Sequence, residues 1–187
     1  MGNFYINIAV QGIPTETLRK KLAALPYPTI LTTEIDGHSF VYGDFFGSGD
    51  RDAPGRLVRL LAAEAGANYA FFCMNADDDV FVYELWKNGE RIDAHCSNPE
   101  LFQPDENDAC APSGDPARLK TVFPFLDEQE TRRVLDSENY VFEFQRHQDL
   151  FRLLRIPTSR AILDFQYLQD GESPEGLDES SLIRIGQ

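Results

Sequence analysis

Three consecutive acids, Asp77, Asp78 and Asp79, are the residues whose type and spacing come closest to doing chemistry. Crowded carboxylates push one another's pKa values apart, so such a group can act as an acid–base pair or hold a metal ion. On an extended chain neighbouring side chains point to opposite faces, so only Asp77 and Asp79 would converge. A calcium loop would also need acids at alternate positions, a Gly and a distal Glu, and that order does not occur. We therefore interpret these acids as a solvated turn or a partner-binding surface, with no metal site.

The three histidines are the other candidates for general bases or zinc ligands. His95 adjoins Cys96, but on a strand the two side chains would face opposite ways and form no thiol dyad by themselves. His147 falls on the apolar side of a predicted helix, which favours a hydrogen-bonded structural role. The sequence indicates no role for His38, and an Asp–His–Cys group assembled across the fold stays open.

The cysteines Cys73, Cys96 and Cys110 are odd in number and lack Cys-x-x-Cys spacing. This pattern argues against a disulfide framework and against a structural zinc site. The chain also lacks Gly-x-Gly-x-x-Gly, a Walker-type Gly-Lys-Ser/Thr, Gly-x-Ser-x-Gly and His-Glu-x-x-His. We therefore expect no catalytic residue, no metal and no cofactor.

Apolar periodicity and turn residues predict the elements that carry these side chains. Residues 4–10 alternate as a strand with one buried face, and helices are expected from Thr15 to about residue 24 and from Pro54 to residue 65. Residues 68–74 look like a buried strand, and hairpins are expected over 29–46 and, around Asn88 and Gly89, over 80–96. The order strand, helix, strand, strand, helix, strand predicts an α+β fold with a ferredoxin-like plait, extended by the second hairpin.

The rest of the chain is predicted to add helices and one more strand. Residues 97–114 form a long acidic loop, helices follow over 115–123, 127–135 and 140–154, and a final strand is expected over 160–169. Residues 1–175 would then make a single domain, with the plait and hairpin in 1–96 and the helices and last strand in 115–175. Residues 176–187 are expected to form a flexible tail.

The net charge of −14 is concentrated in one part of the chain, because residues 75–115 carry eleven acids and only two basic residues. Such a field repels nucleic acid and anionic lipid and attracts basic proteins. No apolar run approaches the roughly 18 residues of a membrane helix, and no signal peptide is visible. We expect a cytoplasmic protein that binds neither nucleic acid nor membrane.

Short motifs spread over about residues 3–175 carry a resemblance. They are Asn3 to Ile8; Asp77 to Val80 with Tyr83, Asn88 and Gly89; Asp93, Ser97, Pro99 and Phe102; Ser113 to Asp115 with Leu119; Arg146, His147, Ile156 and Pro157; and Phe165 to Leu168 with Glu172 and Pro174. Together they resemble an uncharacterised family of bacterial cytoplasmic proteins. That family usually has Gly-Gly-Asp at 113–115 and Leu-Gly-Leu-Pro at 154–157, where this chain has Ser-Gly-Asp and Leu-Arg-Ile-Pro. The resemblance implies one continuous domain and a bacterial origin, and it implies no activity.

These observations predict a non-enzymatic module that binds a basic protein through an acidic surface, for example a bacterial immunity protein that neutralises a basic toxin such as a nuclease. The partner-binding residues would be Asp77, Asp78, Asp79, Glu100, Asp105, Glu106 and Asp108, with Trp86 and Phe102 as aromatic anchors. One alternative is a small-ligand binder or an enzyme with a pocket between the sheet and the C-terminal helices, using His95, Asp93, Asp79 or His147. Another is an oligomeric scaffold.

Overall fold

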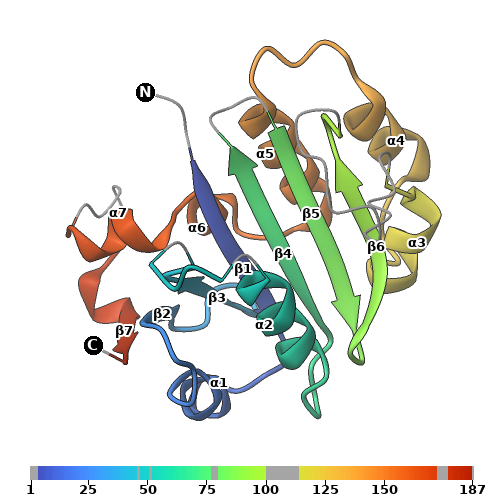
Figure 1. The fold of residues 1–187 in the computed structure, drawn as a ribbon. Coiled ribbons are helices and arrows are strands. Elements are labelled where there is room, and N and C mark those ends of the chain that lie inside the picture. Colours follow the sequence, from blue (N-terminus) through green and yellow to red (C-terminus); the bar gives the residue numbers. More distant parts are fainter. Residues whose placement is uncertain are drawn as a thin grey trace.

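An antiparallel sheet organises the chain (Figure 1). The computed structural model describes residues 4–45, 47–50, 52–76, 80–99, 114–171 and 177–186, and within these the sheet has seven strands in the order β6-β5-β4-β1-β3-β2-β7. The strands are β1 (Tyr5–Gln11), β2 (Thr29–Thr32), β3 (His38–Gly43), β4 (Tyr69–Ala76), β5 (Val80–Lys87), β6 (Glu90–Cys96) and β7 (Leu182–Ile185). Every pair of neighbouring strands is antiparallel.

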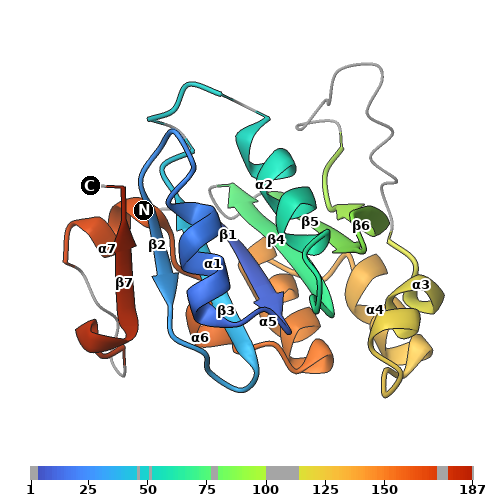
Figure 2. The same cartoon turned by 90° about the horizontal axis from the view of Figure 1, so that it is seen from below.

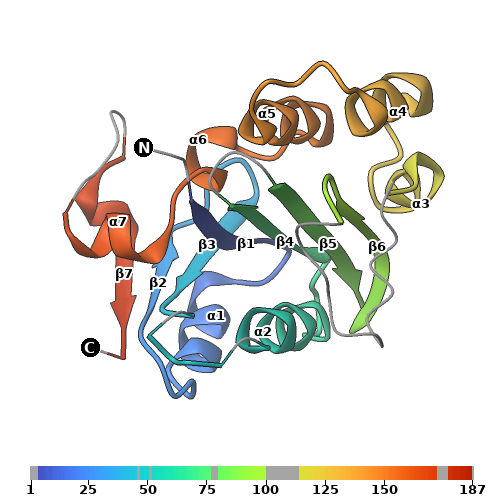
Figure 3. The same cartoon turned by 45° about the horizontal axis from the view of Figure 1, so that its top comes forward.

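Helices cover both faces of this sheet, which makes the protein an α+β protein. The helices α1 (Thr15–Leu22) and α2 (Ala53–Ala62) pack on one face, and Figure 3 shows them on the opposite side from α5 and α6. The other face carries α3 (Pro116–Val122), α4 (Glu128–Asp136), α5 (Glu143–Leu154), α6 (Thr158–Ala161) and α7 (Phe165–Gln169). No helix within the described ranges is long and apolar enough to cross a membrane.

Because both faces are covered, the central strands are buried on both sides. In β1, Ile6, Ile8 and Val10 belong to the apolar cluster under α1 and α2, whereas Tyr5 and Ala9 belong to the cluster under the C-terminal helices. The expectation that this strand has one buried face is therefore wrong. Successive side chains of β1 therefore point alternately into two apolar cores, one on each face of the sheet, and neither face meets solvent.

The two predicted hairpins are present. Asn88 and Gly89 connect β5 and β6 with φ angles of 53° and 76°, as a type I′ turn requires. The turn between β2 and β3 likewise places Asp36 and Gly37 at positive φ. The Gly89 amide also donates to the Ala62 carbonyl at 3.2 Å, so the β5–β6 turn is fixed to the end of α2.

The prediction of a final strand over residues 160–169 is wrong, because this segment forms α6 and α7. Its backbone carbonyls accept hydrogen bonds from side chains of the sheet instead of from a neighbouring strand. The Tyr42 hydroxyl donates to the Arg160 carbonyl at 2.8 Å, and the Asn7 amide donates to the carbonyls of Ala161 and Leu163 at 2.7 and 3.1 Å. These hydrogen bonds attach the segment in its helical form to the sheet.

The chain end also differs from the expected flexible tail. After the short 3₁₀ turn η1 (Glu179–Ser181), β7 pairs with β2, and Figure 2 shows it at the edge of the sheet beside α7. The Arg184 guanidinium donates to the Leu168 carbonyl at 3.1 Å, and Ile185 is buried. The apolar residues of this segment therefore complete one edge of the sheet.

Candidate functional site

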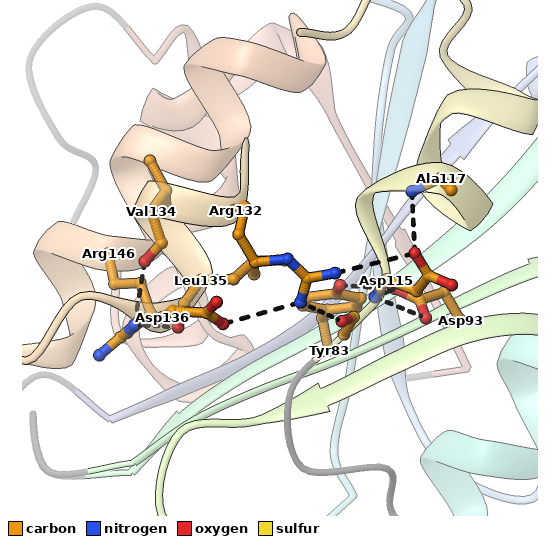
Figure 4. Close-up of polar contacts among 10 residues, drawn as sticks. Tyr83, Asp93, Asp115, Ala117, Arg132, Val134, Leu135, Asp136 and Arg146 are labelled. Atoms are coloured by element: carbon orange, nitrogen blue, oxygen red, sulfur yellow. Dashed lines mark hydrogen bonds and ion pairs between the residues drawn. The ribbon is translucent and has the colours of Figure 1, made fainter. Parts of the chain in front are cut away.

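A buried carboxylate joins the edge of the sheet to the start of α3 (Figure 4). Asp93 of β6 is only 4% exposed, and it accepts a hydrogen bond from the Tyr83 hydroxyl at 2.7 Å. The backbone N–H of Asp115 lies 3.1 Å from both carboxylate oxygens of Asp93. Burial raises the pKa of Asp93, while the hydrogen bonds from Tyr83 and Asp115 act in the opposite direction. Burial, followed by the charge of Asp93, also raises the pKa of Tyr83.

Strand register and helix capping explain how these groups meet. Tyr83 pairs with His95 and Leu85 pairs with Asp93, so Tyr83, His95 and Asp93 share the face that the C-terminal helices cover. Asp115 precedes a proline and caps α3, since its carboxylate accepts the Ala117 N–H at 2.9 Å. Asp115 thus binds the helix through its side chain and the sheet through its backbone.

Gly114 is required by this arrangement. Its φ angle is +62°, and a Cβ atom at this position would lie 2.5 Å from the Tyr83 hydroxyl oxygen. A larger residue would therefore meet both backbone strain and a collision with a buried side chain. The Gly-Asp sequence at 114 and 115 consequently has a packing reason.

Arg132 of α4 reaches the residues at the start of α3. The Arg132 guanidinium donates to the Gly114 carbonyl at 3.2 Å and lies 3.9 Å from Asp115 and 3.7 Å from Asp136. Because Arg132 is 44% exposed, these ion pairs contribute little to stability.

Arg146 of α5 is buried, and it satisfies the carbonyls at the end of α4. It donates to Val134 at 2.9 Å, to Leu135, and to Ser137 at 2.7 Å, and it pairs with the Glu143 carboxylate at 2.7 and 3.2 Å. Helix ends leave their last carbonyls without partners, so a buried guanidinium at this place connects two helices firmly.

Two hollows flank this framework. The first, of about 550 Å³, lies between α3 and α4 and is lined by Asp115, Glu128 and both Arg132 and Arg133. The second, of about 440 Å³, lies between the end of β6 and the α4–α5 connection.

The lining of the second hollow mixes sheet and helix residues. His95 and Ser97 come from the sheet side, and Asp136 comes from the end of α4. Glu138 and Tyr140 come from the α4–α5 connection, and Glu143 and Arg146 come from α5. The sequence did not single out Asp136, Glu138, Tyr140 or Arg146 as site residues. A signal that could have found the first three is the composition of residues 136–144, where three acids accompany four large apolar or aromatic residues.

His147 and Cys73 are built into the core. His147 is fully buried, with Nδ1 2.5 Å from the Tyr5 hydroxyl and Nε2 3.5 Å from Cys73 Sγ, and the Cys73 thiol donates to the Ala161 carbonyl at 3.8 Å. Burial lowers the pKa of His147 to about 3 and raises the pKa of Cys73, so both groups are neutral at pH 7. The predicted structural role of His147 agrees with these hydrogen bonds. A neutral thiol without solvent access is no nucleophile.

His38 has a similar setting, since its ring nitrogens lie 2.9 Å from the Asp36 carbonyl and 2.5 Å from the Tyr69 hydroxyl. Burial lowers the pKa of His38. No group of three or more metal-ligating side chains occurs among the residues that the structure describes.

Most of the predicted partner-binding residues lie outside the described residues. These are Asp77, Asp78, Asp79, Glu100, Phe102, Asp105, Glu106 and Asp108. Trp86 is described and half-buried, and its Nε1 donates to Glu84 at 2.8 Å. It packs with the cluster under α1 and α2, on the opposite face of the sheet from Asp93 and His95.

Of the alternative pocket residues, the structure brings only His95 to the second hollow. Asp93 is enclosed beneath Asp115, His147 is enclosed in the core, and Asp79 lies outside the described residues. Comparisons with protein-family models, with curated proteins and with solved structures found no match to this chain.

Proposed function

We propose that this chain is a non-enzymatic protein-binding module that recognises a basic protein through an acidic surface. In its concrete form it is a bacterial cytoplasmic immunity protein that neutralises a basic toxin, such as a nuclease. The observation that carries the proposal is the excess of nine negative charges within residues 75–115. A field of this kind speeds the approach of a cationic protein and favours it over other partners.

The placement of the residues that flank the acidic segment supports this proposal. Ser97 lines the second hollow and Asp115 lines the first, and both hollows also receive carboxylates from α4 or its end. Segment 100–113, with four of the predicted binding acids, connects these two places in the sequence. Ser97 and Asp115, the described residues near the two ends of this segment, therefore each lie beside a hollow that α4 also lines.

The engagement of the other polar groups points in the same direction. Asp93, His147 and Cys73 have hydrogen-bond partners inside the protein and are almost completely enclosed. By contrast, Val141 and Phe142 are 79% and 46% exposed, and in the sequence they stand between Tyr140 and Glu143, which line the second hollow. Exposed apolar residues beside charged ones are a common composition of protein-binding surfaces.

Capture of partners from the bacterial host, followed by kinetics with the purified partner, tests the proposal. We expect a cationic protein whose association rate falls more than about tenfold between about 0.05 and about 0.5 M salt, because the attraction is screened. A variant with Asn at positions 77–79 should associate more slowly and dissociate at nearly the same rate. A partner without basic character, or rates that ignore salt, would refute the acidic-surface mechanism.

A small-ligand site is the second candidate, and the second hollow favours it. Its volume of about 440 Å³ falls within the range of small-molecule pockets, and it lies between the sheet and the C-terminal helices as this alternative requires. Mass spectrometry of the protein purified under native conditions distinguishes the two: a copurified small molecule that Glu138→Arg abolishes would favour the ligand-binding function.

We also infer that the first six elements form a ferredoxin-like plait within a single domain. The central strand order β4-β1-β3-β2, all antiparallel, supports this topology. The packing of α1 and α2 on the same face supports it as well.

A further inference from the structure

We propose that residues 136–144, which comprise the α4–α5 connection and the helix residues that adjoin it, form a docking surface for a basic segment of a protein partner. An arginine or lysine side chain of the partner enters the second hollow, and a neighbouring apolar residue of the same segment packs on Val141 and Phe142. The inference rests on the proposed function, since it names the contact by which a basic protein is held.

The apolar part of the surface comes from two adjacent residues. Val141 is 79% exposed, more than any other large apolar side chain in the described part of the chain, and Phe142 is 46% exposed. The rings of Phe142 and Phe144 lie 6.2 Å apart, which extends the apolar area along the start of α5. Single exposed apolar residues are ordinary, whereas contiguous exposed apolar patches mark interaction sites, and this one lies in the same segment as residues that line the hollow.

The charge of the hollow selects a cation. Three carboxylates line it, from Asp136, Glu138 and Glu143, against one guanidinium, from Arg146. The hydrogen bonds of that guanidinium go to the end of α4 and to Glu143. Glu138 has no ion pair within the described ranges, so it is available to a partner. An anionic ligand would be repelled here, while an arginine or lysine would find a carboxylate to pair with.

The connection is held in the shape that the partner would meet. Arg146 fixes its first part through the Ser137 carbonyl, and the Tyr140 hydroxyl donates to Asp149 at 2.9 Å. The Arg146 guanidinium also lies over the Tyr140 ring at 4.9 Å. A surface that is already ordered loses little conformational entropy on binding, which favours affinity.

The test titrates the ¹⁵N-labelled full chain with a defined peptide and follows backbone amide shifts by NMR. The probe is a capped pentapeptide with arginine at its centre and leucine on both sides. We expect shifts at residues 136–146 and near His95 and Ser97. Replacing the peptide's arginine with citrulline should weaken binding by about fivefold or more, because citrulline keeps the shape and loses the charge.

Matched variants separate the two parts of the surface. Phe142→Ser should reduce affinity by about tenfold through loss of apolar contact, and Glu138→Gln by about threefold. Phe142 is the N-cap residue of α5, where Ser is favoured, so the fold should persist. Leu60→Ser, at 44% exposure on α2, and Glu90→Gln, at the exposed start of β6, are the controls and should leave binding unchanged.

The outcomes distinguish this inference from the function on which it rests. Shifts confined to residues 77–79 or 100–108 would overturn the docking surface and leave an acidic protein-binding module standing. Absence of any shift, or equal losses in the control variants, would also overturn it. The proposed function itself fails only in the salt-dependent capture experiment.

Discussion

Replacing Gly114 with Ala tests whether close packing against Tyr83 is what holds the start of α3. Two penalties are expected. A left-handed φ angle costs a residue with a Cβ about 1–2 kcal/mol. The collision 2.5 Å from the Tyr83 hydroxyl oxygen should add about 1–3 kcal/mol, the usual cost of overpacking. Tyr83 cannot simply move away, since its hydroxyl donates a hydrogen bond to Asp93 and its ring stacks on His95 with ring centroids 5.5 Å apart.

A matched glycine separates the two penalties. Gly49 has a φ angle of +65°, and a Cβ there would meet nothing within 4 Å, so Gly49→Ala should show the backbone cost alone. Tyr83→Phe should by itself cost about 1.5–3 kcal/mol, because it removes a hydrogen bond to a charged group. In that background Gly114→Ala should lose most of its collision and come close to the cost of Gly49→Ala.

The assay is urea unfolding, followed by the fluorescence of Trp86, the only tryptophan, and by circular dichroism. A double-mutant cycle over Gly114 and Tyr83 should give a coupling of about 1–3 kcal/mol. Equal losses for Gly114→Ala and Gly49→Ala, or a coupling near zero, would refute the packing argument. Such a result would mean that the chain around Gly114 relaxes without cost.

Two further predictions concern the buried polar groups of α5. Arg146→Met should destabilise the fold by about 3–5 kcal/mol, because it leaves Glu143 and the α4 carbonyls unpaired. In the same urea assay, Arg152→Met, which removes an exposed ion pair with Asp149, should cost less than about 1 kcal/mol, and equal losses would contradict the role of Arg146. Burial lowers the pKa of His147 to about 3 from its ordinary 6.5, so the stability contributed by this neutral ring is complete above pH 6.5 and is lost as the pH falls from there toward 3. NMR should show the His147 ring unprotonated at about pH 5, with the free energy of unfolding falling below pH 6.5, and a ring that titrates near 6.5 would disprove its burial.

The sequence predicted the elements of the first half because local rules decide them. Asn88 and Gly89 tolerate positive φ, and Pro54 suits a first helical turn, so these positions depend little on the rest of the fold. The covering of both sheet faces was not predictable from β1 alone. Alternation along a strand shows that successive side chains point to opposite faces of the sheet. Only the positions of the helices decide whether the second face meets water.

The failure at residues 160–169 has a tertiary cause. Phe165 and Leu168 are three residues apart and both buried, as a helix allows, while Tyr167, which strand alternation places inside, is 38% exposed. A short apolar segment can match the periodicity of a helix or that of a strand. Here the helical form is attached to the sheet by hydrogen bonds from Asn7 and Tyr42, which lie far away in the sequence. The second hollow could not be predicted for the same reason, since β6, α4 and α5 meet only in the folded chain.

Some polar side chains near the proposed docking surface are buried and others are exposed, and this difference decides how an interface must be mapped. Arg146 fixes the end of α4, which leads into residues 136–144, and Asp93 fixes the start of α3, which packs against α4. Both side chains are buried and already hydrogen-bonded within the protein. Their loss would weaken binding by displacing the surface, and this would occur together with a loss of stability. Substitutions at Glu138 or Phe142 should instead weaken binding in a protein of unchanged stability, because these side chains project from the fold. Binding and unfolding measured on the same variants therefore separate residues that contact the partner from those that only hold the contact in place.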